Sequence, residues 1–212
     1  MDKYILMLIL IGMYSNPFAG SSERNEIIDL VRSERDIYIV YTKISNTEGT
    51  EKNLSVMDSL WKSDFSEFSD VQRTNSDKYL IRLALASVLV QAVRQCRYKT
   101  VGIDEFHNFF LLKTKSDNPS IKSDSMRLLG LAGFDSDIPY LEKIIKTEQE
   151  GYAEEAALSI MFIHSKAGLN ALEKLSNSVS RPALKEFILE IVVKYKAYPL
   201  IDDSKDCYST KP

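Results

Sequence analysis

The sequence predicts an all-α protein of about eight to ten helices. Apolar residues recur at three- and four-residue spacing through every long segment. Glycine and proline are scarce, at 8 and 6 of 212 residues, which disfavours a turn-rich all-β fold. Two stretches that begin 31 residues apart, IPYLEKIIKT and LNALEKLSNS, share one pattern. This recurrence predicts a repeated helix within a helix-pair α-solenoid.

The first residues, 1–21, have the pattern of a cleavable signal peptide. Lys3 precedes an apolar run from Tyr4 to Met13, and the small residues Ala19 to Ser22 follow. The run is shorter than the roughly twenty residues that span a bilayer. We therefore expect an exported protein, periplasmic or secreted, with no stable membrane span after signal removal. A buried N-terminal helix is the alternative.

Charge and cysteine content restrict the expected partners and compartment. The chain has 27 basic and 30 acidic residues, a net charge of −3, which gives no electrostatic basis for nucleic-acid binding. Its two cysteines are Cys96 and Cys207. In an exported protein they can form a disulfide that ties down the polar tail, 199–212. The alternative is two unpaired cysteines, because sequence alone does not determine pairing.

The N-terminal region, 22–116, has helical periodicity but no repeat motif. Within it, IYIVYTKI also has strand-forming residues, so a local strand is the alternative there. Ser76 and Asp77 are expected to cap an almost wholly apolar helix, which should be the most buried element. The helical segments expected here are 24–45, 54–73, 77–95 and 103–112.

Helix boundaries are clearer in the C-terminal region, 117–198. Asn118 and Pro119 are typical of a helix start, and Gly133 is typical of a helix end. Asp137 is expected to cap the next helix. The helices expected after it are 138–148, 152–164, 167–177 and one from Pro182 to about Tyr198.

The repeated pattern extends across a whole helix–turn–helix. With a 31-residue shift, the matched apolar pairs are Leu129/Ile160, Ala132/Ile163, Ile138/Leu169, Leu141/Leu172 and Ile144/Leu175. The stretch MRLLGLAGFDSDIPYLEKIIKT resembles a HEAT-like repeat, and AEEAALSIMFIHSKAGLNALEKL resembles a second copy with a different turn. The resemblance covers about residues 124–197. It implies a binding scaffold. We expect residues 22–198 to form one continuous domain.

Two alternative functions are kept open. Asp104, Glu105 and His107 share one helix, and Asp104 with His107 has the spacing of a general base or half a metal site. This segment would be the centre of an exported hydrolase or metal-dependent enzyme. The segment matches known metal-site motifs poorly, so a structural role is favoured for His107. His164 is expected to cap a helix end. An apolar-ligand carrier would use the aromatic residues, Trp61, Phe65, Phe68, Phe106, Phe109 and Phe110, which at helical spacing are more often core.

The leading hypothesis is an exported, non-enzymatic protein-binding module with an inhibitor, immunity-type or assembly role. Lys143 and Lys174 occupy equivalent positions in the two repeats, and Tyr140 and Asn170 lie beside them. These residues predict a mildly basic polar strip on the face lined by helices 138–148 and 167–177. The expected partner is another protein with an acidic patch. No cofactor and no metal are expected.

Overall fold

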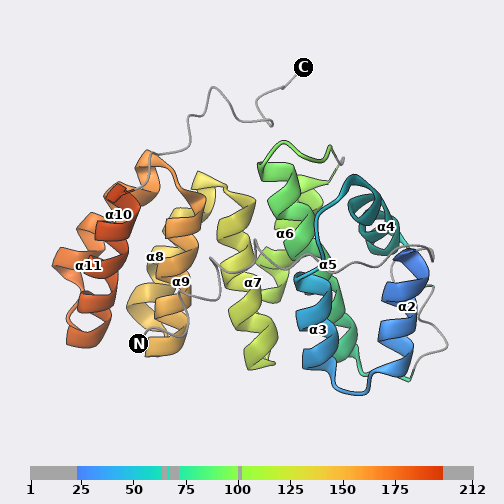
Figure 1. The fold of residues 1–212 in the computed structure, drawn as a ribbon. Coiled ribbons are helices and arrows are strands. Elements are labelled where there is room, and N and C mark those ends of the chain that lie inside the picture. The colour runs from blue at the N-terminus through green and yellow to red at the C-terminus, as the bar shows by residue number, and fades with distance from the viewer. Residues whose placement is uncertain (1–22, 64–65, 67–71, 100–101, 198–212) are drawn as a thin grey trace. The chain divides into compact units, whose positions relative to one another are not determined.

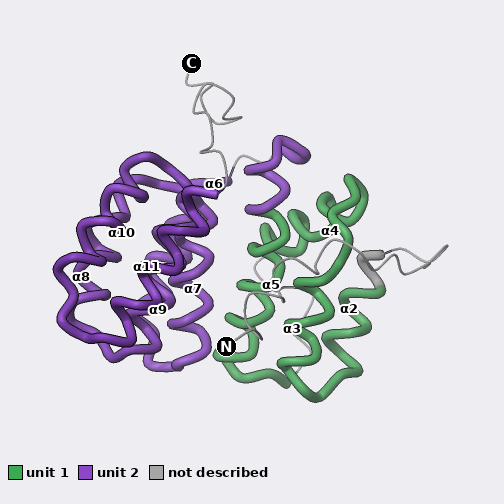
Figure 2. Tube along the Cα trace, turned by 60° about the vertical axis from the view of Figure 1, so that its left-hand side comes forward, with its two compact units in different colours: residues 1–89 green, residues 90–212 purple. Residues whose placement is uncertain are grey.

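The computed structural model describes residues 23–63, 66, 72–99 and 102–197, with side chains from Glu26 onward (Figure 1). The expected signal peptide, 1–21, and the polar tail, 199–212, lie outside the described residues. The described residues form ten α-helices and one 3-10 turn, without a strand. The predicted all-α class is confirmed. The chain divides into two compact units, residues 1–89 and 90–212 (Figure 2).

Two helices replace the single periodic segment expected near the start of unit 1. α2 spans Glu23–Ser33 and α3 spans Ile37–Ser45. The break has a local cause, because the Asp36 carboxylate accepts a hydrogen bond from the Tyr38 amide and starts α3. The alternative strand is wrong: IYIVYTKI is helical, with Val40 and Ile44 buried one turn apart.

Helix α4, Glu51–Lys62, starts earlier than the sequence predicted. The Thr50 hydroxyl accepts from the Asn53 amide and caps it. Its inward face buries Leu54, Met57, Leu60 and Trp61. The Arg82 guanidinium lies 4.2 Å from the centre of the Trp61 ring, in cation–π geometry.

Helix α5, Asn75–Arg94, is the long apolar helix that the sequence predicted. Every residue from Leu80 to Val93 is buried except Arg82 and Gln91, the longest such run among the described helices. The helix starts at Asn75, two residues before the expected start, so Ser76 lies in its first turn and Thr74 takes the capping position. Thr74 and Asp77 form a reciprocal capping box in which each side chain accepts from the other's amide.

After the end of α5, the described residues of unit 2 form six successive α-helices. They are α6 (Ile103–Lys113), α7 (Pro119–Ala132), α8 (Ile138–Thr147), α9 (Glu150–Ile163), α10 (Lys166–Ser178) and α11 (Pro182–Ala197). α9 packs against both α7 and α11, and α8 packs beside α10. Alternate helices are thus neighbours, as expected for stacked helix pairs.

Helices α7 and α9 approach each other at Gly130. A Cβ atom on Gly130 would lie 2.1 Å from the Ser159 carbonyl oxygen. The Ser159 hydroxyl donates to the Met126 carbonyl oxygen at 2.6 Å. Glycine is required at position 130 because the backbone of α9 occupies the space of any side chain.

Candidate functional site

Helices α8 and α10 carry the lysines that the sequence selected for partner binding. Lys143 lies two residues after Leu141, and Lys174 lies two residues after Leu172. Both leucines are fully buried, and both lysines are exposed. Since two residues correspond to about 200° around an α-helix, each lysine points away from the core.

Burial largely follows the 31-residue shift between the two similar segments. Four of the five apolar pairs are buried at both positions, and in the fifth Ile138 is buried while Leu169 is half-buried. The helix ends also correspond. Gly133 and His164, again 31 residues apart, both have left-handed backbone conformation after α7 and α9.

The same shift relates α6 to α8, which the sequence did not reveal. Phe110 corresponds to Leu141, and neither side chain is exposed. Leu112 corresponds to Lys143, and both are exposed. Thr114, at the end of α6, donates to or accepts from the Tyr140 hydroxyl at 2.8 Å and joins α6 to α8. Helices α6, α8 and α10 therefore share one register.

Four exposed lysines form what we call the lysine strip: Lys143, Lys146, Lys166 and Lys174. On α10, Lys166, Asn170 and Lys174 are spaced four residues apart, which places them on one helix face. Within the part of the chain that the structure describes, no carboxylate pairs with a lysine of the strip. The nearby Glu173 is paired instead with Lys196, at 2.6 Å. The four lysines outnumber the two carboxylates of α8 and α10, Glu142 and Glu173, on a protein of net charge −3.

The two polar residues predicted beside the lysines differ in environment. Asn170 is exposed on the strip. Tyr140 is half-buried, and its hydroxyl is engaged by Thr114. In the repeat, Tyr140 corresponds to the buried Ala171 and Asn170 to the exposed Pro139. Tyr140 therefore joins two helices in addition to any contact with a partner.

His107 pairs with Asp137 across two elements. Its Nε2 lies 2.8 Å from Oδ2 of Asp137, at the start of α8. Burial raises the pKa of Asp137, and the hydrogen bond to His107 lowers it in part. The expected neighbours Asp104 and Glu105 are exposed instead. The sequence predicted Asp137 only as the residue that caps helix 138–148. Residue spacing gives no sign of a contact between two side chains thirty positions apart.

The His107–Asp137 pair is arranged like a structural tie. The side chains of His107 and Asp137 are only 15% and 6% exposed. The imidazole also packs against Phe134, with ring centroids 4.3 Å apart. An aspartate hydrogen-bonded to a histidine supplies two of the three residues of a hydrolytic triad, so the pair alone is not a triad. Across the described ranges, no three His, Cys, Asp or Glu side chains form a metal-binding group.

The aromatic residues proposed to line an apolar cavity are mostly core where they are described. Phe106 and Phe110 are fully buried, and Trp61 is 2% exposed. Phe65 and Phe68 lie outside the described residues. The described aromatic residues at helical spacing are therefore mainly part of the packed core.

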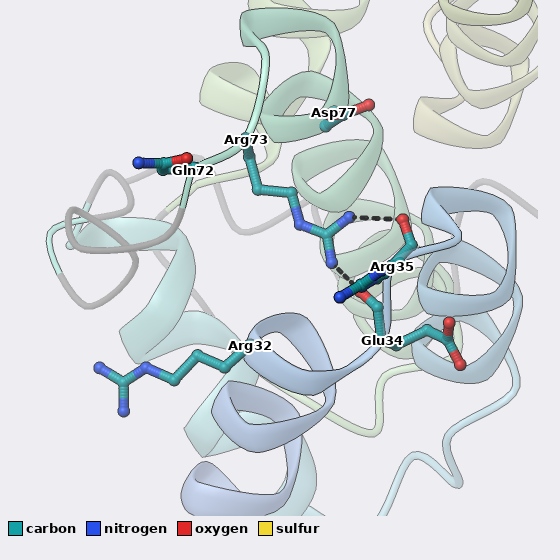
Figure 3. A pocket seen from close by; sticks show the side chains of 6 residues that line it. All are labelled: Arg32, Glu34, Arg35, Gln72, Arg73 and Asp77. Atoms are coloured by element: carbon teal, nitrogen blue, oxygen red, sulfur yellow. Dashed lines mark hydrogen bonds between the residues drawn. The ribbon is translucent and has the colours of Figure 1, made fainter.

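A polar pocket of about 340 Å³ lies in unit 1, between the end of α2 and the start of α5 (Figure 3). Its lining residues are Arg32, Glu34, Arg35, Gln72, Arg73 and Asp77. Arg73 donates to the Val31 carbonyl at 2.8 Å and to the carbonyls of Glu34 and Arg35. Its guanidinium thus satisfies the carbonyls at the C-terminal end of α2.

Arg94 has a similar role in unit 2 and was missed by sequence reasoning. Its guanidinium donates to the carbonyls that end α7 and α9: Gly130 at 3.3 Å, Leu131 at 3.2 Å, Phe162 at 2.5 Å and Ile163 at 3.0 Å. The carbonyls of Leu131 and Phe162 are themselves equivalent in the repeat. A single cation therefore neutralises the negative ends of two equivalent helices.

Comparison with known proteins gives no match: no family model, no curated protein sequence and no solved structure is similar to this chain. No helix among the described residues is long and apolar enough to cross a membrane.

Proposed function

We propose that this protein is an exported, HEAT-like helical module that binds an acidic patch of another protein with its α8–α10 face. The observation that carries the proposal is the lysine strip, whose four exposed lysines have no carboxylate partner among the described residues. Stacked helical repeats present such surfaces to partners. Complementary charge would increase the association rate and fix the register of the complex.

Export is supported by two features. The N-terminal segment has the composition of a signal peptide. In addition, Cys96 is disulfide-bonded, and disulfides persist in oxidising compartments. The other cysteine of the chain is Cys207, which lies outside the described residues. N-terminal sequencing of natively expressed protein should find a start near Ser21 or Ser22, and an intact Met1 would refute the export proposal.

The repeat architecture is supported by burial rather than by family membership. At equivalent positions of α6, α8 and α10, Phe110, Leu141 and Leu172 are buried and Leu112, Lys143 and Lys174 are exposed, and equivalent backbone positions end α7 and α9. A two-helix unit cannot bury its apolar face alone, so successive units must stack. We infer a HEAT-like stack for unit 2.

The binding test compares two charge reversals. The double variant Lys143→Glu, Lys174→Glu lowers the net charge by four, from −3 to −7. The matched control, Lys43→Glu with Lys185→Glu, makes the same change at exposed lysines on α3 and α11. Both should change the free energy of unfolding by no more than about 0.5 kcal/mol for each exposed site.

The partner is captured by cross-linking from the envelope and medium fractions of the source cells. The α8–α10 reversal should lose a protein that the wild type and the control both retain. That protein should also dissociate as ionic strength rises, because exposed charges are screened. Equal capture by all three proteins would show that the strip is only a solvated face.

A further inference from the structure

The polar pocket of unit 1 is lined by more positive than negative groups. Its lining has three arginines, two carboxylates and one amide: Arg32, Arg35, Arg73, Glu34, Asp77 and Gln72. All six residues lie between positions 32 and 77, so unit 1 forms the pocket alone. Its volume of about 340 Å³ is at the lower end of the range for small-ligand pockets. Its size and lining therefore suit a small, polar ligand.

The two carboxylates of the lining do not neutralise its arginines. Glu34 accepts a hydrogen bond from the Asp36 amide at 3.1 Å, and Asp77 accepts one from the Thr74 amide at 3.1 Å. Within the described part of the chain, neither carboxylate forms an ion pair. Figure 3 shows both carboxylates turned away from the Arg73 guanidinium. Their hydrogen bonds are therefore to the local backbone.

Arg73 has a positive charge and one donor that its present contacts do not satisfy. Its Nη1 and Nη2 atoms donate to backbone carbonyls at the end of α2. These carbonyls carry only partial negative charge. The Nε atom of Arg73 is buried and has no hydrogen-bond partner. Buried donors in native proteins nearly always have an acceptor, so an acceptor with negative charge would complete the surroundings of Arg73.

Arg35 adds a second guanidinium without a carboxylate partner. Its side chain is exposed, and it forms no ion pair with any described residue. The Asp36 carboxylate, next in sequence, caps α3 and does not line the pocket. Like charges repel, so two guanidiniums that line one small pocket are stabilised by an anion near both. Arg32 and Gln72 lie on the side opposite the two carboxylates (Figure 3).

We propose that this pocket binds a small molecule that carries a phosphate or carboxylate group. A planar guanidinium can donate two parallel hydrogen bonds to such an oxyanion, which makes arginine a preferred residue for these ligands. Arg35 would contact the oxyanion directly, and Arg73 would supply a fixed positive charge at the pocket wall. The pocket lies in unit 1 and the lysine strip in unit 2, so this inference does not depend on the proposed function.

Isothermal titration calorimetry of the full chain tests the pocket with two probes, sodium phosphate and sodium succinate. The buffer is Tris chloride at about 150 mM ionic strength, which screens non-specific attraction to exposed charges. At least one probe should give saturable heat with a Kd of about 1 mM or tighter. Binding of phosphate alone, of succinate alone or of both identifies the group that the pocket recognises. The absence of saturable binding for both probes overturns the proposal.

Charge variants at Arg35 locate the bound probe. Arg35→Gln should weaken binding at least about tenfold, because a charge-assisted hydrogen bond is lost. Arg35→Glu, which adds a third carboxylate to the lining, should abolish binding. Lys43→Gln is the matched control, because it removes an exposed positive charge from α3 of the same unit, and it should bind as the wild type. Arg73 is kept in every variant because it also caps α2.

Circular dichroism of each variant checks that the helices are retained. The site is confirmed if only the two Arg35 variants lose affinity. An equal loss of affinity in Lys43→Gln overturns the proposal, because the probe would then respond to net charge alone. Wild-type affinity in Arg35→Glu also overturns it, because the oxyanion would then lie outside this pocket.

Discussion

Gly133 and His164 have the same left-handed backbone conformation, 31 residues apart, at the ends of α7 and α9. Glycine adopts this conformation without strain, whereas a side chain costs roughly 1 kcal/mol. His164 offsets the strain because its ring stacks on Tyr195, with centroids 5.1 Å apart. Gly133 faces the Arg94 guanidinium, whose carbon would lie 3.2 Å from an added Cβ.

The two positions should therefore respond differently to substitution. Gly133→Ala should lower the free energy of unfolding by about 1–2 kcal/mol through backbone strain and the Arg94 contact. His164→Gly should change it by less than about 1 kcal/mol, because relief of strain offsets the lost ring stacking. Urea unfolding measures both. An equal loss at the two positions would contradict this account.

Arg94→Met should destabilise the fold. It removes four hydrogen bonds to helix-end carbonyls and keeps much of the side-chain length. We expect a loss of about 2–4 kcal/mol, because charge-assisted bonds to partly buried carbonyls contribute more than neutral ones. The control Arg97→Met removes an exposed arginine that bonds to Gln95 and should cost at most about 0.5 kcal/mol. Chemical denaturation of the three proteins decides the comparison.

His164 should make stability depend on pH. Burial and the neighbouring Arg94 lower its pKa from the ordinary value of 6.5. The folded protein then binds the proton less tightly than the unfolded chain, so stability falls as pH drops through 6.5 and levels off below the folded pKa. His164→Asn keeps a residue that tolerates the left-handed conformation and removes the proton. The variant should gain stability relative to the wild type between about pH 7.5 and pH 5, and a constant difference would refute the assignment.

The His107–Asp137 contact should contribute to stability as a coupled pair. His107→Ala leaves a buried carboxylate without its partner, so we expect a loss of about 2–3 kcal/mol. Asp137→Asn should also destabilise, and a double-mutant cycle should give coupling of at least about 0.5 kcal/mol. Additive effects would mean that the 2.8 Å contact is energetically unimportant.

The purified protein should contain no free thiol. Cys96 is disulfide-bonded, and the chain has two cysteines. A thiol reagent added under denaturing, non-reducing conditions should therefore not react, and reduction should release two thiols per chain. Two reactive thiols without reduction would contradict the disulfide and weaken the argument for export.

The amino-acid sequence alone determined the fold class and the helices of unit 2. These features depend on local rules: apolar spacing, the Asn118 cap, and Gly133 after the last turn of α7. Leu141 and Leu172 could be placed in the core, and Lys143 and Lys174 outside it, because each leucine and the lysine after it lie on opposite sides of one helix. The break between α2 and α3 escaped prediction because the apolar spacing continues across it from Leu30 to Ile37, while the Asp36 carboxylate starts a new helix.

Only the tertiary structure decided which polar groups meet. The partners of Arg94 lie 36 to 69 residues away along the chain, and Asp137 lies thirty residues from His107. Sequence spacing carries no signal for such contacts, because they depend on how helices stack rather than on the period within a helix. The likeness between α6 and α8 likewise required the burial of Phe110 and the exposure of Leu112. Periodicity determines which face of a helix is buried, and packing determines what that face meets.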